Sequence, residues 1–149
     1  MKEIKKQSEG VNYSSIEVGA MNELNEHVLT LAPGVEILGK VFVGETLHTT
    51  GAEMSFQIYA PGQETGFLHT HKTHEELYLF VKGCGEFQVD GEVFPIKEGS
   101  VVRVAPKGKR ALRNNGLEPL VMICVQYKSN SFSDDDAKDG EILEEKVQW

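Results

Sequence analysis

Short runs of apolar residues, several of them alternating with polar residues, recur through most of the chain. Alternation of this kind places every second side chain on one face, which is typical of half-buried strands. The runs are rich in β-branched and aromatic residues, which favour extended structure. Turn-forming residues separate the runs at short intervals. The predicted strands include residues 40–43, 54–59, 77–81, 101–104 and 121–125.

The clearest single element is a β-hairpin over residues 86–94, Glu-Phe-Gln-Val-Asp-Gly-Glu-Val-Phe. Its centre, Asp90-Gly91, readily supplies the two positive φ angles of a type I′ turn, which joins antiparallel strands directly. No internal repeat is visible. Many short strands separated by turns therefore predict an all-β sandwich or barrel.

The two ends of the chain depart from this pattern. One short helix is predicted around residues 21–29. The acidic run Asp134-Asp-Asp136 is interpreted as a solvated connector rather than a cation site. The predicted segments are an N-terminal extension at 1–34 that serves in strand exchange or dimer formation, a barrel at 35–128 and an acidic tail at 129–149.

The composition narrows the classes of function. The 149 residues suffice for one domain, and a net charge of −8 argues against nucleic-acid binding, which needs clustered cationic surface. The longest apolar run, residues 120–125, is too short to cross a bilayer, and the charged start shows no secretory signal. Cys84 and Cys124 are expected to be buried reduced thiols, which favours a cytoplasmic location.

Three of the five histidines fall within six residues, in the segment 67–76. Side chains at i and i+2 of a strand point to the same face about 6.5–7 Å apart, so His69 and His71 are placed to bind one metal ion. Glu76 has an odd offset from His71, and a turn over the polar residues 72–75 is expected between them. The returning strand then carries Glu76 and Tyr78 on one face.

These residues resemble the first motif of the cupin superfamily. That motif is a glycine-led turn, His-x-His, a glutamate after four intervening residues and a glycine after six more. One extra residue separates the first glycine from the first histidine here. The matching residues are Gly62, His69, His71, Glu76 and Gly83.

The family's second motif is visible in residues 99–108, with one more residue before Pro106 than is usual and with Asn115 beyond it. Where similar proteins place a third histidine, three residues after the motif glycine, this chain has Ala111, and a methyl group cannot ligate a metal. The resemblance implies a jelly-roll barrel, or double-stranded β-helix, with a degenerate second motif.

His69, His71 and Glu76 are accordingly the predicted ligands of a divalent ion, with Fe, Mn, Ni, Zn or Co as candidates. His74 is either an extra ligand, a neighbour of the site or a solvated turn residue. Because of Ala111, a second interpretation stays open, in which the histidines are core residues or belong to a site that binds no metal.

Arg103 and Arg113 are candidates to bind a carboxylate or phosphate of a ligand, because guanidinium offers a planar fork to such oxygens. A solvated turn of alternating charge is the alternative explanation of this basic segment. Tyr78 is a further candidate for ligand contact.

Two functions from different classes follow. In the first, the metal acts as a Lewis acid on a small oxygenated substrate or binds dioxygen. Similar proteins include dioxygenases, sugar-phosphate isomerases and decarboxylases, so the resemblance does not define the reaction. In the second, the barrel binds a sugar or an organic anion without converting it. The expected partners are a small molecule and a second copy of the chain in a homodimer, with neither nucleic acid nor membrane.

Overall fold

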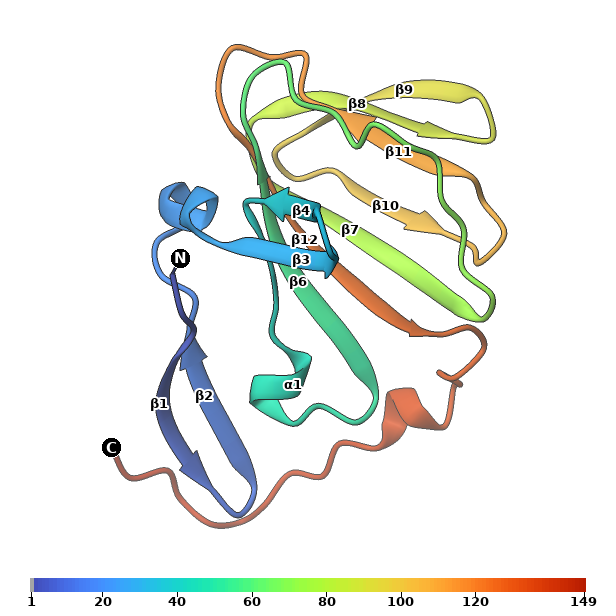
Figure 1. The fold of residues 1–149 in the computed structure, drawn as a ribbon. Coiled ribbons are helices and arrows are strands. Elements are labelled where there is room, and N and C mark those ends of the chain that lie inside the picture. The colour runs from blue at the N-terminus through green and yellow to red at the C-terminus, as the bar shows by residue number, and fades with distance from the viewer. Residues whose placement is uncertain (1) are drawn as a thin grey trace.

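The computed structural model describes residues 2–149 and consists mainly of strands (Figure 1). One sheet has five strands in the order β10-β7-β12-β6-β5, and a second has three in the order β11-β8-β9. Two separate hairpins, β1-β2 and β3-β4, lie in the N-terminal part. The elements are β1 (Lys5–Gly10), β2 (Tyr13–Glu17), the 3-10 helix η1 (Met21–Glu26), β3 (Val28–Ala32), β4 (Val35–Leu38), β5 (Lys40–Phe42), α1 (Gly44–Leu47), β6 (Ala52–Tyr59), β7 (His74–Lys82), β8 (Cys84–Val89), β9 (Glu92–Lys97), β10 (Val101–Val104), β11 (Arg110–Arg113), β12 (Leu120–Lys128) and the 3-10 helix η2 (Asp136–Lys138).

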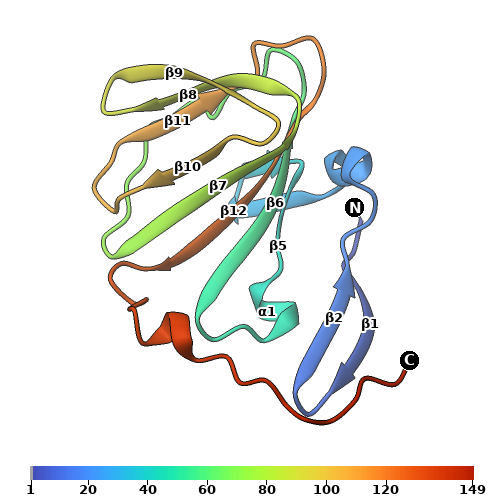
Figure 2. The ribbon, with the colours of Figure 1, turned by 180° about the vertical axis from the view of Figure 1, so that it is seen from behind.

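The two larger sheets face each other and enclose the main core, as both views show (Figures 1 and 2). Alternation along β7 turns Glu76, Tyr78 and Phe80 inward, and all three are buried. Phe87 of β8 is fully buried opposite them, with its ring centroid 4.9 Å from that of Tyr78 and 6.3 Å from that of Phe80. The predicted all-β class is confirmed.

The predicted hairpin is also confirmed. β8 and β9 pair antiparallel up to Val89 and Glu92, on either side of the turn. Asp90 and Gly91 have φ angles of 52° and 92°, as a type I′ turn requires. β11 pairs with the other edge of β8 and brings a second row of inward side chains to this sheet.

A smaller core joins the N-terminal segment to the outer face of the five-stranded sheet. Ile58 of β6 and Val121 of β12 pair across the strands and pack with Leu24 of η1, which is fully buried. His27 is buried as well, with Nε2 2.8 Å from the carbonyl oxygen of Val18. The N-terminal extension therefore covers one face of the sheet.

The helix predicted around residues 21–29 is only partly correct. A 3-10 helix spans Met21–Glu26, but Val28 already begins β3, which pairs with β4. Valine, leucine and threonine follow in β3, and β-branched residues favour strands. The predicted boundary after residue 34 falls within the turn of this hairpin.

The cysteines differ from each other. Both are free thiols, and Cys124 of β12 is buried, but Cys84 at the start of β8 is exposed. The prediction that both are buried is therefore wrong for Cys84, because alternation along β8 places it in the row opposite to the buried Gly85 and Phe87. Among residues 2–149, no helix has the length and apolar character that a membrane crossing requires.

Gly83, between β7 and β8, lies close to the backbone of Pro119 and Leu120, and its substitution tests this contact. It has a φ of 81°, and an added Cβ would lie 2.4 Å from the Pro119 carbonyl oxygen and 2.9 Å from Leu120 Cα. Left-handed backbone costs an alanine about 1–2 kcal/mol, and contact with fixed backbone adds to this. Gly83→Ala is therefore expected to lower the free energy of unfolding in urea by at least about 2 kcal/mol.

Gly91→Ala is the matched control. Gly91 has a φ of 92° but no atom within 4 Å of the added Cβ, so only the backbone strain remains. Equal losses of stability in the two variants would contradict the close contact at Gly83.

Candidate metal centre

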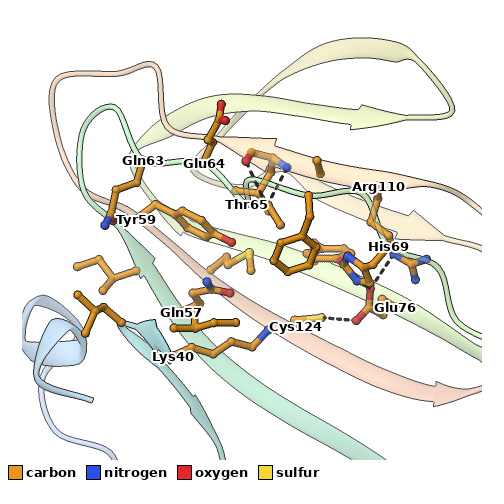
Figure 3. A pocket seen from close by; sticks show the side chains of 18 of the residues that line it. Lys40, Gln57, Tyr59, Gln63, Glu64, Thr65, His69, Glu76, Arg110 and Cys124 are labelled. Atoms are coloured by element: carbon orange, nitrogen blue, oxygen red, sulfur yellow. Dashed lines mark hydrogen bonds and ion pairs between the residues drawn. The ribbon is translucent and has the colours of Figure 1, made fainter. Parts of the chain in front are cut away.

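A cavity of about 380 Å³ lies between the inner faces of the two larger sheets (Figure 3). This volume is within the range of small-molecule sites. Much of the wall is apolar, formed by side chains such as Phe87, Leu112 and Met122. The polar side chains that matter for its chemistry are Lys40, Gln57, Tyr59, His69, Glu76 and Arg110.

His69, His71 and Glu76 bring their ligand atoms together within 4.8 Å of one another. His71 Nε2 lies 3.1 Å from Glu76 Oε1, and His69 Nε2 lies 3.7 Å from Glu76 Oε2. The carboxylate thus stands between the two imidazoles. Three such donors are a chemically suitable set for a divalent transition-metal ion.

The two histidines lie on an extended segment rather than in a regular strand. His69 forms an isolated bridge with Arg110, in which each backbone N–H donates to the other residue's carbonyl. The backbone N–H of His71 donates to the Pro106 carbonyl at 2.8 Å. The predicted turn before Glu76 is shorter than expected, because β7 begins at His74. Glu76 and Tyr78 nevertheless share the inward face as predicted.

The protonation states suit a metal. Burial lowers the pKa of His71 and so favours the neutral imidazole, despite the opposing charge of Glu76. Burial by itself would raise the pKa of Glu76, but the imidazole of His69, the hydroxyl of Tyr78 and the charge of Arg110 hold it below its usual range. His71 Nε2 is buried and has no hydrogen-bond partner. The residues present therefore fit a divalent ion.

Glu76 has three further neighbours from the protein. The Tyr78 hydroxyl donates to Oε2, and the Cys124 thiol lies 3.6 Å from Oε1. Burial raises the pKa of Cys124 to about 12, so its thiol stays protonated. Arg110 Nε donates to Oε2 at 2.9 Å. These contacts fix the position of the carboxylate.

Arg110 is the residue that the sequence-based reasoning missed. Its side chain is 1% exposed, and Nη1 donates to the carbonyl of Gly108 at 2.8 Å. Nη2 is buried without a partner. The buried guanidinium of Arg110 thus supplies a positive charge beside Glu76, in addition to any that a bound divalent ion would bring.

The spacing of the second motif predicts that the third ligand position is residue 111, which is an alanine. In the structure, the neighbouring Arg110 points toward Glu76. On β11, Arg110 and Leu112 face the interior, and Ala111 pairs with Gln88 in the alternate row. The extra residue before Pro106 explains the difference. With the family's usual spacing, the position of the third histidine is residue 110 when it is counted from Gly99 and residue 111 when it is counted from Gly108. Alternation along β11 was the signal that could have found it.

A similar shift applies to the asparagine of the second motif. Asn114, not Asn115, is buried. Its Nδ2 donates to the carbonyl oxygens of Tyr59 and Glu118 at 2.9 and 2.8 Å. The Asn114 side chain therefore connects the end of β11 to the end of β6 by a hydrogen bond beside the cavity.

The structure places Arg103 and Arg113 in ion pairs away from the candidate metal ligands. Arg103 forms two hydrogen bonds with Glu75, at 2.7 and 2.9 Å, and does not line the 380 Å³ cavity. Hydrogen bonding to Arg103 leads the effects that lower the pKa of Glu75 to about 2. Arg113 Nε donates to Glu86 at 2.7 Å, and the Arg113 side chain lines an adjoining groove that shares part of its wall with the cavity.

The structure also places the two remaining predicted site residues, Tyr78 and His74. Tyr78 lines the cavity and contacts Glu76 rather than solvent. His74 is exposed at the start of β7, with its ring centroid 6.1 Å from that of His71, and is not among the convergent ligand atoms.

Two facing antiparallel sheets with histidine and carboxylate side chains between them are typical of the double-stranded β-helix class of β-barrels. Residues 55–126 match the family model described as a cupin domain. Over 106 residues the chain is 35% identical to an uncharacterised protein of Methanocaldococcus jannaschii, covering 68% of this chain and 81% of that protein. The chain belongs to the cupin family.

Solved structures agree with this assignment. A cupin protein from Bacteroides fragilis superposes with a TM-score of 0.66 at 33% identity, over 70% of this chain and 88% of that one. A predicted oxalate decarboxylase from Thermotoga maritima has a TM-score of 0.55 at 23% identity, over 68% and 90% of the two chains. The second likeness shows the fold alone. The predicted jelly-roll class is therefore confirmed.

Proposed function

We propose that the protein binds a divalent metal ion through His69, His71 and Glu76 and receives a small oxygenated molecule beside it. The observation that carries this proposal is the convergence of the three donor atoms within 4.8 Å at the wall of a cavity. A facial set of three protein ligands leaves positions for water and substrate. When bound, such an ion supplies Lewis-acid chemistry.

The surrounding residues have roles that do not depend on the identity of the metal. Tyr78 and Arg110 orient the Glu76 carboxylate by donating to Oε2. The backbone bonds of His69 and His71 set the imidazoles beside it. This preorganisation lowers the cost of bringing three donors to one ion.

A second function, ligand binding without metal or turnover, is favoured by one observation. Arg110 already neutralises Glu76, at an Nε to Oε2 distance of 2.9 Å. The cluster therefore has little net negative charge to attract a dication. In this alternative, the Arg110–Glu76 pair and the histidines hydrogen-bond directly to the ligand.

Metal analysis separates these two functions. Untagged wild-type protein is expected to contain a stoichiometric divalent ion, and His69→Ala is expected to lose at least about tenfold in affinity, as outer-shell losses already cost 10–100-fold. His74→Ala, which removes an exposed histidine from the same segment, is the control and should retain the ion. Wild-type protein that is poor in metal and indifferent to His69→Ala would favour the metal-free function.

We propose further that the chain forms a homodimer and that it works in the cytoplasm. Both proposals keep the expectations drawn from the sequence: the N-terminal extension serves in dimer formation, and reduced thiols favour the cytoplasm. Both cysteines are free in the structure, which agrees with a reducing location.

A further inference from the structure

Lys40 is a cation inside the cavity that the proposed metal centre does not use. It lies on β5, where it pairs with Gln57 of β6, and its side chain lines the cavity. Figure 3 shows its amine directed toward Cys124. Within residues 2–149, no carboxylate lies within 4.0 Å of this amine.

The contacts that Lys40 does make leave its charge uncompensated. Its Nζ lies 5.1 Å from the centroid of the Phe42 ring, a cation–π contact that satisfies none of the three N–H donors. The carboxylate that acts on its pKa is that of Glu76, which lies beyond 4.0 Å from this amine and is already paired with Arg110. Burial lowers the pKa of Lys40, and the charge of the Glu76 carboxylate opposes this effect. A partly buried ammonium in this state favours a bound anion.

Two neutral donors lie beside Lys40 on the same inward face. The side chains of paired residues such as Lys40 and Gln57 are about 5 Å apart at Cβ in an antiparallel pair. Gln57 is 5% exposed and lines the cavity, and Tyr59 follows it two residues later on the same face. Burial raises the pKa of Tyr59 to about 12, so its hydroxyl remains a donor.

We propose that Lys40 and Gln57 bind the carboxylate of the cavity's ligand, which makes this ligand a small organic acid. One unpaired ammonium matches the single charge of a carboxylate better than a phosphate monoester, which carries nearly two charges at neutral pH. The apolar wall at Leu112 and Met122 accommodates a hydrocarbon body. The inference rests on the proposed function only in that the cavity receives a ligand, and it does not require the metal.

The test uses matched pairs of an acid and its neutral amide, benzoate with benzamide and butyrate with butyramide. Binding is measured by NMR titration at millimolar concentrations, on protein freed of metal with a chelator, so that no ion attracts the carboxylate. Wild type is expected to prefer each acid. Lys40→Met is expected to weaken acid binding by about tenfold to a hundredfold, as for the loss of a charged hydrogen bond, and to leave amide binding unchanged.

Two further variants sharpen the result. Lys97→Met removes an exposed lysine of β9 and should bind the acids like wild type. Gln57→Leu removes a neutral donor and should weaken acid binding by about twofold to tenfold, which tests the site independently of Lys40. Preference for the acids that survives in Lys40→Met, or wild type that prefers none of them, would overturn the inference.

The outcome is distinguishable from that of the metal proposal. If wild type carries no metal as purified but selects carboxylates through Lys40, the inference stands and the metal centre is rejected. If wild type carries stoichiometric metal but shows no preference for acids after chelation, the metal centre stands and the Lys40 site is rejected.

Discussion

Replacing Arg110 with methionine is expected to lower the free energy of unfolding by about 3–5 kcal/mol, the cost typical of removing one partner from a buried ion pair. The Arg110 side chain is 1% exposed and that of Glu76 is 3% exposed, so water does not screen their interaction. Methionine fills a similar volume but leaves the carboxylate without its guanidinium. Urea unfolding of chelator-treated protein measures the loss.

Arg113→Met is the matched control. Arg113 lies on the same strand, β11, and also pairs with a glutamate, but its side chain is 57% exposed. Exposed pairs contribute little, so a loss below about 1 kcal/mol is expected. In Arg110→Met, addition of a divalent ion should recover stability, because the ion replaces the missing positive charge. Equal stability of Arg110→Met and wild type without metal would contradict the assigned role of Arg110.

Phe87→Ala is expected to destabilise the protein by a similar amount, about 3–5 kcal/mol, because a large buried side chain leaves a cavity that its neighbours fill only partly. Phe87 is fully buried, and its ring contacts those of Tyr78, Phe80 and Phe94 between the two sheets. Its side chain also lines the ligand cavity. Chemical denaturation with an unchanged denaturant slope would assign the loss to the native state.

Phe132→Ala provides the comparison for this variant. Phe132 is 73% exposed beyond the end of β12, so its removal should change stability by no more than about 0.5 kcal/mol. A small loss in Phe87→Ala as well would mean that the two sheets are not held together by this aromatic cluster.

The candidate metal ligands could be predicted because their spacing is local. His69 and His71 are two residues apart on an extended segment, and Glu76, Tyr78 and Phe80 alternate along β7. Side chains two residues apart share a face wherever the backbone is extended. The structure brings these side chains together even though the histidine segment forms an isolated bridge rather than a full strand.

Arg110 and Lys40 were not predicted, and the reasons differ. For Arg110, a shift of one position in the motif count moved the expected inward residue to Ala111, and a one-residue shift in a strand reverses the face of every side chain. For Lys40, no feature of the neighbouring sequence indicates that a lysine at the edge of a sheet points into a cavity. That direction depends on how β5 pairs with β6, in which Lys40 lies opposite Gln57, 17 residues away along the chain.

The amino-acid sequence by itself determined the all-β class, the Asp90-Gly91 hairpin and the histidine and glutamate donors. Each of these depends on residues close together in the chain, where turn chemistry and two-residue periodicity act directly. Only the tertiary structure decided which charges neutralise each other. Arg110 reaches Glu76 across 34 positions, while Arg103 and Arg113 pair outside the cavity. Such pairs depend on sheet register and on which faces become buried, and these arise only when distant strands meet.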